Sequence, residues 1–109
     1  MTVQHQDLAA GGWHQRPLAD QLANVGSEVG RMRRWHGRNP EVCEHAFLRA
    51  LELLDLTIGD ARWSGRRKEL SRARACLCDA MLGGREHGST LEELDRYFLA
   101  FAVAARAGR

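Results

Sequence analysis

The sequence predicts an all-α fold, an antiparallel four-helix bundle with up-down-up-down topology formed by residues 17–109. The composition favours helix, because the 109 residues include only two prolines and are rich in Leu, Ala, Arg and Glu. Apolar residues recur at steps of three and four in four separate segments, which places them on one face of a helix in each segment. Short loops join these segments and favour packing between consecutive helices.

Composition and charge limit the classes of function. The formal net charge of +2 arises from 16 Lys and Arg against 14 Asp and Glu, and it neither requires nor excludes a nucleic-acid partner. The three cysteines show no disulfide framework, which favours a reducing compartment. The longest apolar run, residues 97–105, is half the length of a membrane span. We therefore expect a cytoplasmic protein that does not enter membranes.

Residues 1–16 are predicted to form a flexible N-terminal tail. The segment is polar and contains Leu8 and Trp13 as its large apolar side chains, with no apolar stretch typical of a secretory signal. Two outcomes remain open at this point. Either the tail is disordered or Trp13 docks on the bundle.

The first helix is predicted from Pro17 or Leu18 to Trp35. Beside its apolar face runs a stripe of small residues that includes Gly26 and Gly30. A glycine inside a helix costs about 1 kcal/mol relative to alanine. Two interpretations remain open: another helix backbone approaches closely at these glycines, or the helix is locally weak.

Strong boundary signals delimit the other helices. Asn39 is a good N-cap and Pro40 suits a first helical residue, so a second helix is predicted from Pro40 to Ile58. A third helix is predicted over about 66–82. Ser89 and Glu92 have the spacing of a capping box, which predicts that Ser89 caps a fourth helix ending near residue 107.

Metal binding is not predicted. Cys43 and His45, like Cys76 and Cys78, are two residues apart and point in nearly opposite directions on a helix. Neither pair can chelate one ion, and structural zinc sites use other spacings. The cysteines are better interpreted as small apolar residues, and no metal and no cofactor are expected.

The end of the first helix offers one catalytic alternative. Arg31 and His36 resemble the R-x₄₋₆-H element of HEPN ribonucleases, which are also helical. The resemblance implies metal-independent RNA cleavage, with His36 as acid or base and Arg31 stabilising phosphate charge. The competing interpretation is a solvated basic end of the first helix that complements the helix dipole. We predict no catalytic residues and lean towards a protein that is not an enzyme.

A basic cluster at the start of the third helix is the candidate RNA-binding surface. Basic side chains next to an aromatic ring can hold phosphates and stack a base. The alternative is that the cations of this cluster, which continues to Arg72 and Arg74, pair with the acidic residues of the second helix. The candidate residues are Arg62, Trp63, Arg66, Arg67 and Lys68.

The second and fourth helices carry more apolar surface than a bundle core needs. A bundle helix normally buries a stripe of a little over 100°. The additional residues predict an interface in which the second helix of one subunit meets the fourth helix of a neighbour, a head-to-tail contact that closes into a ring. The predicted interface residues are Val42, Leu53, Leu56, Leu99 and Val103.

Four stretches together resemble a family of small, conserved, functionally uncharacterised bacterial proteins: LANVGSEVG at 22–30, RALELLDLTI at 49–58, GRRKEL at 65–70 and YF at 97–98. This resemblance implies a cytosolic four-helix bundle that assembles into a ring of about five subunits. The architecture is also loosely similar to the S23-type and retroelement-accessory bundles, which act with RNA. We expect a non-enzymatic oligomeric scaffold or binding module, or alternatively an RNA-binding accessory protein.

Overall fold

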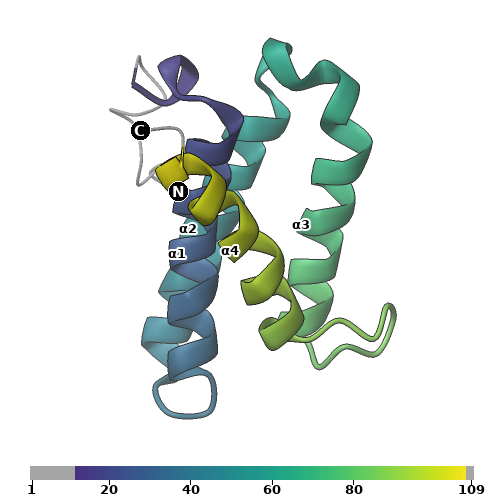
Figure 1. Cartoon of the computed structure of the whole chain (residues 1–109). Helices are drawn as coiled ribbons and strands as arrows, with labels where there is room; N and C mark the ends of the chain where they lie inside the picture. Colours follow the sequence, from purple (N-terminus) through teal and green to yellow (C-terminus); the bar gives the residue numbers. More distant parts are fainter. Residues whose placement is uncertain (1–11, 108–109) are drawn as a thin grey trace.

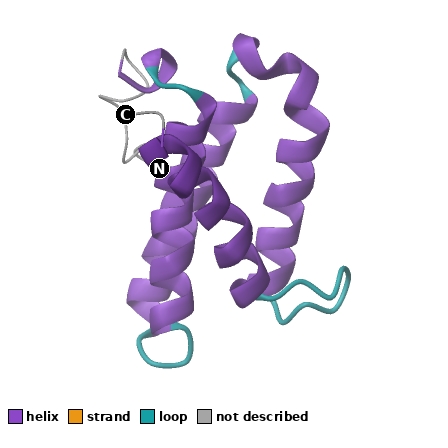
Figure 2. Cartoon of the chain, in the orientation of Figure 1, coloured by secondary structure: helices purple, strands orange, loops and turns teal. Residues whose placement is uncertain are grey.

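The computed structural model describes residues 12–107, and in this range the chain is all-α. Figure 2 shows helices joined by short loops, with no strand in the described part. The radius of gyration is 13.4 Å, as expected of a compact domain of about this length. The helices are α1 (Leu18–Trp35), α2 (Pro40–Ile58), α3 (Arg67–Met81) and α4 (Leu91–Ala107), with the short 3₁₀ helices η2 (Trp13–Gln15) and η3 (Ala61–Arg66).

The helix α1 is the centre of the packing. Both α2 and α4 pack along it, whereas α3 contacts the rest of the protein more sparsely through α2 and α4. Figure 1 shows α4 crossing in front of α1 and α2, with α3 standing to one side. The α1–α2 and α3–α4 connections lie at one end of the molecule, and η3 lies at the other.

The predicted helix boundaries are confirmed to within one residue. The side chain of Asn39 caps α2 by accepting a hydrogen bond from the Val42 amide at 3.3 Å, and Pro40 is the first helical residue, as predicted. The third helix begins at Arg67, because η3 occupies the preceding residues.

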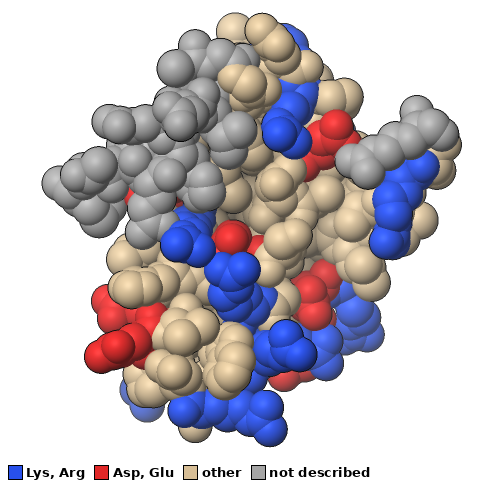
Figure 3. Space-filling model, turned by 90° about the vertical axis from the view of Figure 1, so that its left-hand side faces the viewer, with Lys and Arg blue, Asp and Glu red and all other residues tan. Residues whose placement is uncertain are grey.

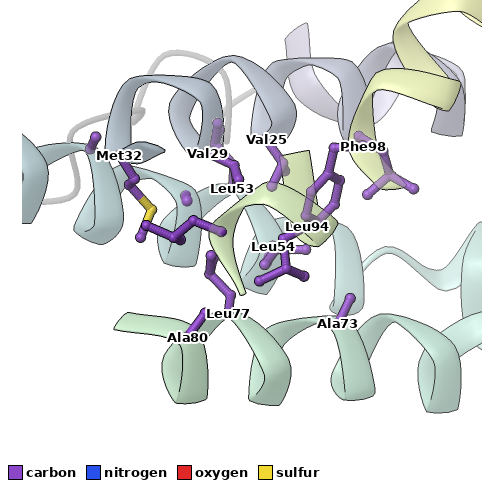
Figure 4. Packing of buried hydrophobic residues seen from close by; sticks show 14 of the residues in the cluster. Val25, Val29, Met32, Leu53, Leu54, Ala73, Leu77, Ala80, Leu94 and Phe98 are labelled. Atoms are coloured by element: carbon purple, nitrogen blue, oxygen red, sulfur yellow. The ribbon is translucent and has the colours of Figure 1, made fainter. Parts of the chain in front are cut away.

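Side chains from all four helices form the core, and on α2 they include Leu53, which was predicted to lie in an interface. Figure 4 shows side chains of α1 and α2 meeting those of α3 and α4. Phe98 is the largest fully buried side chain of α4. The largest fully buried aliphatic side chains are Leu22, Val25, Val29, Met32, Leu54, Leu70 and Leu77.

The small-residue stripe of α1 is where α4 packs. A Cβ atom added at Gly26 would lie 2.8 Å from the Cβ of Phe98, whereas one at Gly30 would lie 3.5 Å from an oxygen of Asp95. Carbon atoms that are not bonded do not pack as close as 2.8 Å, whereas 3.5 Å is an ordinary van der Waals contact. The close-approach interpretation is therefore confirmed at Gly26.

The residues just before α1 are packed rather than loose. Trp13 has no exposed surface, and its carbonyl accepts a hydrogen bond from Gln21 Nε2 at 2.8 Å. The carbonyl of Arg16 accepts one from Arg62 Nη2 at 2.8 Å. Of the two outcomes left open for the N-terminal segment, the docking of Trp13 is the one observed, while Leu8 lies outside the described residues.

The predicted capping box at α4 is wrong by one residue. The hydroxyl of Thr90, not Ser89, accepts the Glu93 amide at 3.1 Å. The Ser89 amide instead donates to the carboxylate of Asp79 at 3.1 Å, so Glu92 has no capping role there. Because the carboxylate of Asp79 binds the Ser89 amide, Thr90 caps the helix and α4 starts one residue later than predicted.

Replacing Thr90 with alanine should therefore destabilise the protein by about 1 kcal/mol, because the Glu93 amide loses its acceptor. Thr90→Ser retains the capping oxygen and is the matched control, expected to unfold close to the parent. Urea unfolding followed by circular dichroism measures both. Equal midpoints for Thr90→Ala and the parent would contradict the assignment.

Candidate interaction surfaces and polar sites

A buried carboxylate joins the N-terminal segment to the α2–α3 connection. Asp60 is only 5% exposed and accepts hydrogen bonds from Arg62 Nη2 at 2.8 Å and Arg62 Nε at 3.1 Å. Gln21 Nε2 donates to the same carboxylate at 3.3 Å, and His14 Nδ1 lies 3.2 Å from it. Asp60 therefore links residues 14–21 to the α2–α3 connection, which lies 39 to 46 residues later in the sequence.

The charges at this site are fixed by their partners. Hydrogen bonds from the Arg62 side chain hold the pKa of Asp60 well below its usual range, against the opposing effect of burial. The same contact raises the pKa of Arg62. Both groups are charged near neutral pH, so Asp60 is unsuited to proton transfer there, which requires a pKa close to the working pH.

Two predicted RNA-binding residues belong to this structural network. The indole Nε1 of Trp63 donates to Gln21 Oε1 at 2.9 Å. The guanidinium of Arg62 lies 4.5 Å from the centre of the Trp63 ring while it also binds Asp60. The arginine and the aromatic ring are adjacent, as predicted, but both bind within the protein.

The other predicted RNA-binding residues also have protein partners, with one exception. Arg66 forms an ion pair with Glu69 at 3.0 Å, and Arg67 Nε donates to the Ile58 carbonyl at 3.0 Å. Lys68 is exposed, and no partner for it occurs in residues 12–107. RNA binding itself stays a prediction.

Pairing between α2 and α3 is observed at one ion pair. Arg74 Nε lies 2.8 Å from the Asp55 carboxylate. The alternative interpretation, in which cations of the third helix pair with acids of the second, is thus confirmed at this position. Both side chains are more than a third exposed, so this pair contributes less than about 1 kcal/mol.

A groove with a volume of about 270 Å³ lies between α3 and α4. Ala73, Cys76 and Leu94 form part of its wall. Tyr97 also lines it and donates its hydroxyl proton to Glu69 at 2.8 Å. Burial, assisted by Glu69, raises the pKa of Tyr97 to about 12. The phenol is therefore protonated at neutral pH and acts as a hydrogen-bond donor.

The residues that resemble the HEPN element do not share a cavity. Arg31 pairs with Glu28 at 3.5 Å. His36 instead lines a separate cavity of about 320 Å³ together with Arg33, which binds Asp95 at 3.0 Å. Figure 3 shows Lys and Arg side chains gathered at the lower end, where α1 finishes. This arrangement is that of a basic helix end, the interpretation that competed with the HEPN-like element.

The cysteines are separated within the described structure. Cys43 is buried and its thiol lies 3.6 Å from the Met32 carbonyl, and burial raises the pKa of this thiol. Cys76 and Cys78 are half-buried. Across residues 12–107, no three His, Cys, Asp or Glu side chains form a group that could hold a metal ion.

The predicted interface residues on α2 are more buried than those on α4. Leu53 is 3% exposed, so its prediction as an interface residue is wrong. The physical reason is that α2 packs against both α1 and α3, which together cover a wider arc than one neighbour would. Val42 and Leu56 are half-buried on the same helix.

The outer face of α4 remains open within the described structure. Leu99 is 54% exposed and Val103 is 52% exposed. Only Leu82, at 80%, is a more exposed large apolar side chain in residues 12–107. Leu99 and Val103 are four residues apart and therefore lie on the same face of α4.

None of the helices in the described range combines the length and the hydrophobicity that crossing a bilayer requires. Comparison of the chain with protein-family models, with curated proteins and with solved structures finds no match.

Proposed function

We propose that this chain is a non-enzymatic helical binding module that works as a homo-oligomer in the cytoplasm. The observation that carries the proposal is the pair of exposed apolar side chains, Leu99 and Val103, on one face of α4. Exposed apolar residues that are contiguous on one face are typical of interaction surfaces. The family resemblance, which implies assembly into a ring, agrees with self-association. We further propose that the four helices are arranged antiparallel, up-down-up-down, which leaves α4 with an outer face.

The buried carboxylates support a structural rather than a catalytic role. Asp60 binds Arg62, as described above. Asp79, 6% exposed, accepts hydrogen bonds from the amides of Glu86 at 2.9 Å, His87 at 3.1 Å and Ser89. These bonds, the Glu86 amide foremost, lower the pKa of Asp79. Both acids are thus used to hold the connections between helices.

The proposal is tested by the molar mass of the full chain in solution. The parent should be an oligomer at micromolar concentration, and Leu99→Glu combined with Val103→Glu should reduce it to a monomer with unchanged helix content, because buried charge opposes association. Leu82→Glu is the matched control, since Leu82 is also exposed but lies outside α4, and its mass should equal that of the parent. A parent that is monomeric at every concentration would overturn the proposal.

A further inference from the structure

The exposed face of α4 carries two apolar residues, Leu99 and Val103, within a stripe of heptad spacing whose other three members are charged. Five residues of this face, all exposed, follow one another at steps of four, three, four and three along the helix. This alternation is the heptad spacing at which two helices keep a continuous contact. The five residues, here called the α4 stripe, are Glu92, Arg96, Leu99, Val103 and Arg106.

The charges of the α4 stripe are arranged with opposite signs at its two ends. Glu92 lies in the first turn of α4, and Arg106 lies in the last. No ion pair within residues 12–107 involves Glu92, Arg96 or Arg106. Glu92 is available because Thr90, rather than the predicted capping box, begins the helix.

We infer that two copies of this chain pair through the α4 stripe, antiparallel, about a two-fold axis at Leu99. This inference rests on the proposed self-association and specifies its geometry. With the axis at Leu99, Glu92 of one copy lies opposite the partner's Arg106, and the reverse pair forms at the other end, as a two-fold interface requires. The two Leu99 side chains meet at the centre.

The two layers between Leu99 and the ends of the stripe are compatible with the same arrangement. Arg96 of one copy lies beside the partner's Val103, and the aliphatic part of an arginine can cover an apolar side chain while its guanidinium stays in water. Beside the stripe, Ala100 is exposed and Ala102 is half-buried, and their small side chains permit close approach of the second helix.

The charge pattern selects the antiparallel orientation. In a parallel pair, Glu92 would face Glu92, and Arg96 and Arg106 would each face their own copies, so like charges would meet in three of five layers. The antiparallel pair replaces the two end layers with attractive contacts. The proposed contact differs from the predicted ring contact between the second and fourth helices, because α2 has Leu53 in the core.

The inferred dimer should be weak. A single helix pair of about four turns buries less than the roughly 1,200 Å² of a standard stable interface. We therefore expect the measured mass to fall from dimer to monomer on dilution, and added salt to promote dissociation, since both end layers are ion pairs.

Charge exchange tests the geometry in the full chain. Glu92→Arg alone and Arg106→Glu alone should each raise the dimer dissociation constant about tenfold. The double variant Glu92→Arg with Arg106→Glu should restore the parent value, because each end layer is again an opposite-charge pair. Glu93→Arg is the matched control, since it makes the same charge change about 100° around the helix. Sedimentation equilibrium measures all five proteins.

A disulfide trap tests the axis independently. Leu99→Cys should form an intermolecular disulfide on mild oxidation, while Ala104→Cys, exposed on the same helix but off the stripe, should not exceed the parent. A disulfide in Leu99→Cys, none above the parent level in Ala104→Cys, and restored association in the double charge variant together support the inference. A dimer or ring that shows neither the charge rescue nor the disulfide of the Leu99→Cys variant overturns the inference but retains the proposed function. A parent that is monomeric at every concentration overturns both.

Discussion

Replacing Asp60 with alanine is expected to lower the free energy of unfolding by about 3 kcal/mol, the largest loss at a single polar side chain described above. Its carboxylate is the shared acceptor for Arg62 and Gln21 and contacts His14. Removing it takes the acceptor from the buried Gln21 amide, from the Arg62 amide and from the Arg62 guanidinium, and the buried donor carries a desolvation cost, whereas the 39% exposed Arg62 side chain can turn to water.

Asp55→Ala is the control for this prediction. Asp55 is also an aspartate in an ion pair with an arginine, but its side chain is 56% exposed. A loss below about 1 kcal/mol is expected, because water replaces a surface partner. Urea unfolding of parent and variants, followed by circular dichroism, gives both values. Losses of equal size would contradict the structural role assigned to Asp60.

The contribution of Asp60 should also depend on pH. Its pKa in the folded protein lies well below the ordinary value of about 3.9 that it has in the unfolded chain. The stabilisation is therefore fully present above the unfolded pKa and is lost progressively as the pH falls towards the folded pKa. The difference in stability between the parent and Asp60→Ala should decrease below about pH 4.

Gly26→Ala is expected to destabilise the protein by about 2 kcal/mol, although alanine is the better helix former. The added methyl group would lie 2.8 Å from the Cβ of Phe98, an atom fixed to the backbone of α4. Relief therefore requires α4 to move away from α1, which loosens the packing around a fully buried ring.

Gly30→Ala is the matched substitution one helical turn later. Its Cβ would meet only an oxygen of Asp95, at 3.5 Å, so the gain in helix propensity, up to about 1 kcal/mol, should appear as stabilisation. Thermal unfolding of the two variants and the parent measures both changes in stability. Stabilisation by Gly26→Ala would show that α4 does not approach α1 as described.

Local sequence signals predicted the helices well because helix boundaries are set within a few residues. The Asn39-Pro40 pair places the start of α2, and the structure has the expected hydrogen bond to the Val42 amide. The Ser89 cap failed for a non-local reason. Asp79, ten residues earlier, takes the Ser89 amide, and the next hydroxyl along the chain becomes the cap.

The polar site around Asp60 could not be predicted from the sequence because its members are far apart in the chain. Gln21 precedes Asp60 by 39 residues and His14 precedes it by 46. A weak local signal exists in Asp60 and Arg62, since the aspartate side chain accepts the Arg62 amide at 3.1 Å and thereby begins η3. Nothing in that spacing indicates burial or the remaining partners.

The sequence by itself determined the four helices, the small-residue face around Gly26 and the extra apolar pair on α4, because each follows from the periodicity of one segment. Only the tertiary structure decided that Leu53 is covered, that Trp13 docks and that Arg62 binds Asp60. Periodicity fixes the direction in which a side chain points on its own helix. Whether another element lies in that direction, and which charges it brings, depends on how the helices pack against one another.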